Sequence, residues 1–205
     1  MNFAAQIRLR NRSDKSIPSP CNGEGEDGVI KNTVNAHTLI IDDRTRSDTR
    51  SNLGTDWRVV SDTVMGGVSQ GALVAHTLHG RPCLQLTGNV SLENNGGFVQ
   101  ASLDLGTDAL LDASHYLGIE IDVFGNSETY NLHLRTADTG IVWQSYRAHF
   151  QALPQWQTLR LPFADFHPHR ITTPLDVRRL KRIGLVAIGR AFAADVCIAR
   201  VALYG

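Results

Sequence analysis

The chain has 205 residues, of which 42% are hydrophobic and 20% are charged, and its 20 basic and 20 acidic side chains cancel. This length suits one domain with a full core, with or without a tail. Zero net charge gives no electrostatic basis for general nucleic-acid binding, and no run of about 18 apolar residues marks a transmembrane helix. The 18 glycines and only 7% aromatic residues favour a fold with many turns over a helical bundle.

Residues 1–36 are expected to form an N-terminal extension of the folded domain. Four basic side chains precede a segment rich in proline, glycine and acid, Ile17–Gly28, which offers too little apolar surface to order itself. We interpret the extension as disordered or as a mis-assigned translation start, the alternative being a mitochondrial transit peptide. The three cysteines, Cys21, Cys83 and Cys197, do not suggest a disulfide framework. A cytoplasmic location is therefore expected.

Residues 37–205 are expected to be one β-sandwich of two packed antiparallel sheets. Short apolar runs alternate with polar residues and are separated by Gly, Asn, Asp or Pro, as in all-β domains. Helical periodicity is nearly absent, apart from one turn within Asp104–Ser114 and a short helix at Pro174–Arg182. The expected strands include Leu39–Ile41, Ala72–Ala75, Cys83–Leu86, Ile119–Phe124, Tyr130–Leu134, Val142–Phe150, Leu159–Leu161, Ile183–Ile188 and Val196–Leu203.

Two glycine-rich segments interrupt this pattern and are expected to form a pair of structural corners. The first reads WRVVSDTVMGGVSQG from residue 57, and the second reads NNGGF from residue 94. Glycine pairs allow backbone conformations closed to other residues, and Asp, Ser and Asn side chains hydrogen-bond nearby main chain. The loop residues are Asp62, Met65, Gly66, Gly67 and Ser69 in the first segment and Asn94, Asn95, Gly96 and Gly97 in the second.

The first segment also contains G-x-S-x-G at residues 67–71, the pattern of a hydrolase nucleophile elbow around Ser69. That elbow must lead from a strand into a helix. The residues that follow, ALVAHTLHG, are short and better suited to a strand. A catalytic role for Ser69 is therefore not expected.

The two segments resemble those of the complex I intermediate-associated protein 30 family. The match continues through Trp156, the L-P-F-x-D-F run at 161–166 and a closing pair of apolar strands, and it covers about residues 39–204. The resemblance implies a jelly-roll sandwich like the galactose-binding domains and a non-enzymatic protein. Mitochondrial members help to assemble the membrane arm of respiratory complex I, so the resemblance also implies an assembly factor.

Alternation along the central strands suggests a ligand-binding surface. If the runs around residues 118–124, 130–134 and 142–150 are neighbouring strands, one face carries carboxylates, guanidinium groups, an imidazole and an indole. Such groups bind sugars or polar peptides by bidentate hydrogen bonds and stacking, although they would equally form a solvated ladder of cross-strand pairs. The candidate residues are Glu120, Asp122, His133, Arg135, Trp143 and Arg147.

We predict a non-catalytic binding and assembly module, an assembly factor or chaperone-like partner of a respiratory or other membrane-associated complex. The alternative is a carbohydrate- or small-polar-ligand-binding module that uses the face around Trp143. The spacing of Glu120 and Asp122 overlaps that of a glycosidase pair, but nearby arginines would lower the pKa of both carboxyls. The expected partner is a protein, with a glycan as the alternative, and no cofactor, metal or nucleic acid is expected.

Overall fold

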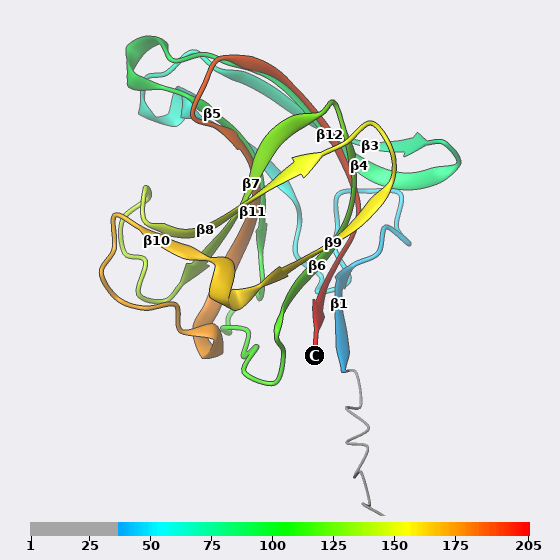
Figure 1. The fold of residues 1–205 in the computed structure, drawn as a ribbon, viewed down its shortest axis with the longest axis vertical. Helices are drawn as coiled ribbons and strands as arrows, with labels where there is room; N and C mark the ends of the chain where they lie inside the picture. Colours follow the sequence, from blue (N-terminus) through cyan, green and yellow to red (C-terminus); the bar gives the residue numbers. More distant parts are fainter. Residues whose placement is uncertain (1–36) are drawn as a thin grey trace, which may run out of the picture. The chain divides into compact units, whose positions relative to one another are not determined.

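The computed structural model describes residues 37–205. Cys21 and the whole predicted extension, residues 1–36, lie outside the described residues, so both domain boundaries stay predictions. No helix in the described part of the chain has the length and apolar character needed to cross a membrane. The chain forms two antiparallel sheets with their faces toward each other (Figure 1). The predicted all-β sandwich of two antiparallel sheets is confirmed.

Sheet 1 has six strands, five of them in the order β3-β4-β12-β6-β9, with β1 also paired to β12. The long strand β12 holds this sheet together because it pairs with β4 over one half and with β6 over the other. The strands are β1 (Thr38–Asp42), β3 (Gln70–Leu78), β4 (Arg81–Val90), β6 (Gly118–Gly125), β9 (Gln157–Pro162) and β12 (Phe192–Tyr204).

Sheet 2 also has six strands, in the order β10-β8-β7-β11-β5-β2. Its strands are β2 (Arg58–Ser61), β5 (Phe98–Asp104), β7 (Glu128–Thr136), β8 (Ser145–Ala152), β10 (His167–His169) and β11 (Leu180–Ile188). Four short 3-10 helices in the described chain connect strands: η1 (Asp62–Met65), η2 (Glu93–Asn95), η3 (Phe163–Asp165) and η4 (Val177–Arg179).

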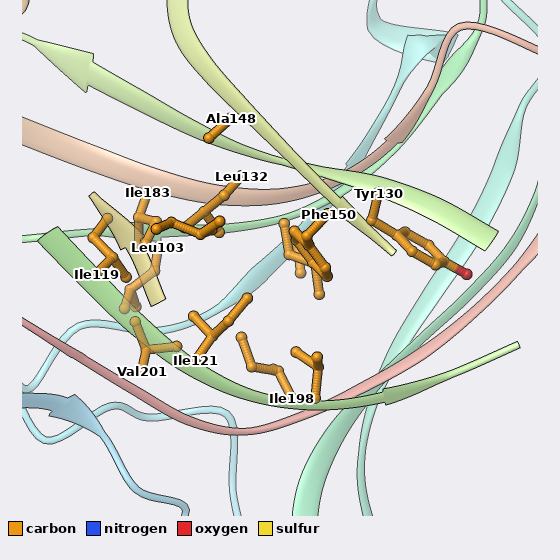
Figure 2. Packing of buried hydrophobic residues seen from close by; sticks show 14 of the residues in the cluster. Leu103, Ile119, Ile121, Tyr130, Leu132, Ala148, Phe150, Ile183, Ile198 and Val201 are labelled. Carbon is orange, nitrogen blue, oxygen red and sulfur yellow. The ribbon is translucent and has the colours of Figure 1, made fainter. Parts of the chain in front are cut away.

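The core lies between the sheets, and alternation along each strand supplies it. Figure 2 shows Leu132 and Ile183 of sheet 2 pointing toward Ile121 and Ile198 of sheet 1. All four side chains are fully or almost fully buried. Because successive side chains of a strand point to opposite faces, burial of one set leaves the other set free for the outer faces. The outer face of sheet 2 carries the candidate site.

Every predicted strand run falls within or overlaps an observed strand, whereas β2, β5 and β10 were not predicted. The predicted helix at Pro174–Arg182 is wrong. Only the 3-10 turn η4 forms there, and β11 begins directly after it because Leu180 and Ile183 are needed in the core. The turn expected within Asp104–Ser114 does not become a helix either.

Candidate functional site

A buried aspartate joins the two glycine-rich segments. The carboxylate of Asp62 accepts hydrogen bonds from the backbone N–H of Ser69 at 2.9 Å and from the Ser69 hydroxyl at 2.5 Å. It also accepts from the backbone N–H of Gly97 at 2.5 Å and of Phe98 at 3.3 Å. Burial works to raise the pKa of Asp62, but these hydrogen bonds outweigh it and leave the pKa below its usual value. Asp62 and Ser69 thus pin the two corners together.

Ser69 has a structural role in this arrangement. Its hydroxyl donates to Asp62 and accepts from the backbone N–H of Ser91 at 3.0 Å, and the residue is fully buried. Strand β3 begins at the next residue, Gln70, where a nucleophile elbow requires a helix. The geometry therefore matches the sequence-based expectation that Ser69 is not a nucleophile.

The two corners raise apolar side chains above one side of sheet 2. Val64 and Met65 of the first corner and Leu92 beside the second are 73%, 50% and 53% exposed. Gly66 and Gly97 take φ values of 88° and 134°, in the region that favours glycine. These glycines let the chain turn sharply enough to leave the neighbouring apolar side chains facing solvent.

The outer face of sheet 2 forms the floor of a cleft of about 670 Å³ between these corners and the loop 137–144. Its central row follows the strand register, in which His133 lies opposite Arg147 on one side and Gly184 on the other. The full row across the sheet is His167, Arg147, His133, Gly184, Ser102 and Arg58. Because Gly184 has no side chain, the Gln100 side chain can lie over it on the floor of the cleft. A Cβ at residue 184 would lie 2.3 Å from the Gln100 amide nitrogen.

The loop 137–144 forms the opposite wall. Arg135 fixes it, because its guanidinium donates to the carbonyl oxygens of Thr139 at 2.9 Å and Ile141 at 3.0 Å. Val142 and Trp143, which follow, line the cleft and are 67% and 47% exposed. Trp143 thus lies on a loop and not on the predicted strand, which begins only at Ser145.

The imidazole of His133 lies at the centre of the floor and is 8% exposed. Its Nε2 atom is buried and makes no hydrogen bond with residues 37–205. Burial lowers the pKa of His133 to about 3, with further lowering from the charge of Arg147 and from His169. His133 is therefore neutral at physiological pH.

The predicted grouping of six residues is only partly correct. His133, Arg135, Trp143 and Arg147 line the cleft together. Glu120 and Asp122 lie on β6, which belongs to sheet 1 and not beside β7 as expected. The two carboxylates are removed from the cleft because the chain changes sheets between β6 and β7.

On sheet 1 the two carboxylates form ion pairs with arginines of neighbouring strands. Glu120 contacts Arg160 at 2.7 Å and also contacts Arg200. Asp122 pairs with Arg81 and accepts a hydrogen bond from the Thr158 hydroxyl at 2.5 Å. The hydrogen bond from Arg160 holds the pKa of Glu120 below its usual value, so the carboxyl is unsuited to act as a general acid. Cross-strand pairing is the observed role.

Sequence reasoning missed several residues of the cleft. Gln100 and Ser102 lie on β5, which was not predicted, and His169 lies on the short strand β10. Arg170 and Gly184 carried no signal of their own in the sequence. The outward phase of β11 could have identified Arg182, whose Nε donates to Asp104 at 2.6 Å.

The fold and the cleft together define a jelly-roll sandwich of the galactose-binding-like class, with a concave site on one sheet face. The chain belongs to the complex I intermediate-associated protein 30 (CIA30) family, whose sequence profile matches residues 47–195. The Asp62 network explains why the two glycine-rich segments occur together in this chain.

Solved structures share the fold at low sequence identity. A family 11 carbohydrate-binding module of a cellulosomal cellulase of Clostridium thermocellum superposes with a TM-score of 0.65 at 12% identity, covering 82% of this chain and 94% of that chain. A family 30 carbohydrate-binding module gives 0.53 at 16% identity, covering 83% and 88%. No curated protein sequence is significantly similar to the chain.

Proposed function

We propose that this protein is a non-catalytic module that docks a protein partner in the cleft of sheet 2 during assembly of a larger complex. Membership of the CIA30 family supports an assembly role, since the name of the family refers to association with an intermediate of complex I. The proposed partner is a subunit or assembly intermediate of a respiratory or other membrane-associated complex. We propose a cytoplasmic location, with a mitochondrial one as the alternative if residues 1–36 act as a transit peptide.

One observation carries this proposal: exposed apolar side chains border the cleft on two opposite sides. Val64, Met65 and Leu92 lie on one side, and Val142 and Trp143 lie on the other. Exposed apolar groups around a concave surface are typical of protein interaction sites. Tryptophan is also among the residues that contribute most to such interfaces.

Photo-crosslinking in the native cell tests the proposal. A photoreactive phenylalanine analogue replaces Val142 in the cleft wall or, as a control, Val74, which is 49% exposed on β3 of the other sheet. We expect a discrete crosslinked protein from position 142, absent from position 74 and reduced by Trp143→Ala. Equal crosslinking from both positions, or none from position 142, would contradict docking in the cleft.

Carbohydrate binding is the second candidate. Solved structures of similar fold include carbohydrate-binding modules, one of them in complex with a β-1,3-1,4-mixed-linked tetrasaccharide. Trp143 supports this alternative because an exposed indole plate can stack on a sugar ring. Titration of the protein with that tetrasaccharide, followed by tryptophan fluorescence, tests it. A saturable change that Trp143→Ala abolishes would favour the carbohydrate function.

A further inference from the structure

The cleft holds positive charge that no carboxylate of the described chain balances. Nine of the 14 arginines in residues 37–205 pair with an aspartate or glutamate, and Arg135, Arg147 and Arg170 are among the five that do not. All three line the cleft, together with Arg182, which is paired with Asp104. No aspartate or glutamate is among the described residues that line it. An anion bound there would meet attraction and no carboxylate in direct contact.

Arg147 is placed to meet such an anion. It lines the cleft and lies between His133 and His167 in the strand register. Its Nε donates to the Ser145 hydroxyl at 2.9 Å, while its two terminal nitrogens form no hydrogen bond with residues 37–205. Burial lowers the pKa of Arg147, and so does the nearby charge of Arg170. A carboxylate would relieve this repulsion and accept two parallel hydrogen bonds from the guanidinium.

The buried imidazole of His133 is a second, independent observation. Its Nε2 has no partner in the described chain, and an unpartnered buried polar atom costs free energy unless a ligand satisfies it. The residue lines the same cleft, next to Arg147. A bound group that reaches the floor would therefore gain a hydrogen bond as well as the charge interaction.

The lining disfavours a neutral sugar. Sugar hydroxyls need acceptors as well as donors, and the described lining offers no carboxylate, only the amides of Gln100 and Gln144, serine hydroxyls and imidazole nitrogens. The walls are mainly aliphatic, and the aromatic side chains that line the cleft are the exposed Trp143 and the half-buried Phe98. Aliphatic walls suit apolar side chains, and a volume of about 670 Å³ is within the range of ordinary ligand pockets.

We infer that the cleft selects an acidic polypeptide segment, with a carboxylate on Arg147 and Arg170 and flanking apolar side chains against Val64, Met65 and Val142. This inference rests on the proposed docking function and adds to it the chemistry of the partner. The segment needs at least one glutamate or aspartate between apolar residues. Its carboxylate replaces the missing counter-charge at the floor of the cleft.

Isothermal titration calorimetry with two peptides tests the inference. The first is an acetylated and amidated peptide of alternating glutamate and leucine, and the second has glutamine in place of every glutamate. We expect the acidic peptide to bind at least tenfold more tightly and to weaken as salt is raised. Arg147→Gln should remove most of this preference. The matched control is Arg160→Gln on the outer face of sheet 1, which should leave it unchanged.

The outcomes separate this inference from the docking function. Equal binding of both peptides, lost in Trp143→Ala but kept in Arg147→Gln, overturns charge selection while docking stands. Binding of neither peptide overturns the inference, and the crosslink from position 142 then decides the docking function by itself. Circular dichroism of Arg147→Gln and Arg160→Gln must match the wild type, and Arg147→Lys should recover part of the acidic preference if charge is what matters.

Discussion

The carboxylate of Asp62 accepts a hydrogen bond from the backbone N–H of Gly97, 35 residues further along the chain, at 2.5 Å. One buried side chain therefore ties together two loops that come from different parts of the sequence. It fixes the position of Val64 and Met65, which border the cleft. The network thus links the family's sequence motifs to the geometry of the proposed docking site.

Replacement of Asp62 by asparagine should destabilise the fold strongly. The amide removes the negative charge and turns one acceptor into a donor, which faces the N–H of Ser69 if it replaces Oδ1 or those of Gly97 and Phe98 if it replaces Oδ2. Hydrogen bonds to a charged group contribute about 1.5–3 kcal/mol each, so we expect a loss of at least about 2 kcal/mol in the free energy of unfolding. Urea unfolding of the wild type and Asp62→Asn measures it.

The pH dependence of stability provides a second readout for Asp62. Since its pKa is lowered in the folded state, its contribution is present above the unfolded value of about 3.9 and is lost as the pH falls below it. The wild type should therefore lose stability in acid more steeply than Asp62→Asn. Parallel acid profiles for the two proteins would contradict a charged Asp62 in the network.

Two glycines beside Asp62 should not tolerate even a methyl group. A Cβ on Gly67 would lie 2.3 Å from the Asp62 Cγ atom, and a Cβ on Gly96 would lie 2.4 Å from Oδ2. We expect Gly67→Ala and Gly96→Ala each to cost about 1–3 kcal/mol in the free energy of unfolding. Gly140→Ala is the matched control, since a Cβ there has no atom within 4 Å. Thermal unfolding that ranks Gly140→Ala with the other two would refute this explanation.

Alternation in the sequence was sufficient to predict the fold class and most of the core. The inward residues of β7 and β8, such as Leu132 and Phe150, follow directly from their spacing. Strand β5 was missed although Val99, Ala101 and Leu103 alternate inward, because the preceding glycines looked like a loop without a strand after it. The short strand β10 contains Pro168 and carries no strand pattern.

The candidate site could not be fully predicted because strand alternation does not determine which sheet a strand joins. Only residues 126 and 127 separate β6 from β7, a length that usually makes a hairpin. Here the chain turns from one sheet to the other, with Gly125 packed so closely on Ala152 that a Cβ would lie 2.4 Å from it. Glu120 and His133 therefore lie on opposite sheets, although their sequence spacing suggested neighbouring strands.

The hydroxyl of Tyr130 should stabilise the fold up to alkaline pH. It accepts a hydrogen bond from the backbone N–H of Asp195 at 2.9 Å and donates to the Asn126 amide oxygen at 2.8 Å. Burial raises its pKa to about 12, so its contribution is present below the unfolded value of about 10 and is lost as the pH rises through about 12.

We expect Tyr130→Phe to lose about 1–2 kcal/mol in the free energy of unfolding at neutral pH. As the pH rises, its free energy of unfolding should fall less steeply than that of the wild type. Tyr116→Phe is the control, because Tyr116 is a partly buried tyrosine packed against the same core. Denaturant unfolding at neutral pH and at about pH 11 compares the two variants. A larger effect of Tyr116→Phe would contradict the role assigned to Tyr130.

Binding of the acidic peptide should strengthen as the pH falls through the titration of His169. This side chain lines the cleft, and burial lowers its pKa, as do the charges of Arg147 and Arg170. It is therefore neutral at about pH 7.5 in the free protein. A carboxylate in the cleft favours the charged imidazole and raises its pKa, so binding takes up a proton and becomes tighter at lower pH.

Calorimetry at about pH 7.5 and about pH 5.5 measures this linkage, since the glutamates of the peptide stay mostly ionised over that range. We expect a several-fold gain in affinity at the lower pH, removed by His169→Gln and kept by His76→Gln, whose position on β3 of sheet 1 is remote from the cleft floor. His133 does not contribute over this range because its pKa of about 3 lies too far below it. A gain that survives in His169→Gln would show that another group takes up the proton, and His169 would then not be the imidazole that the peptide's carboxylate charges.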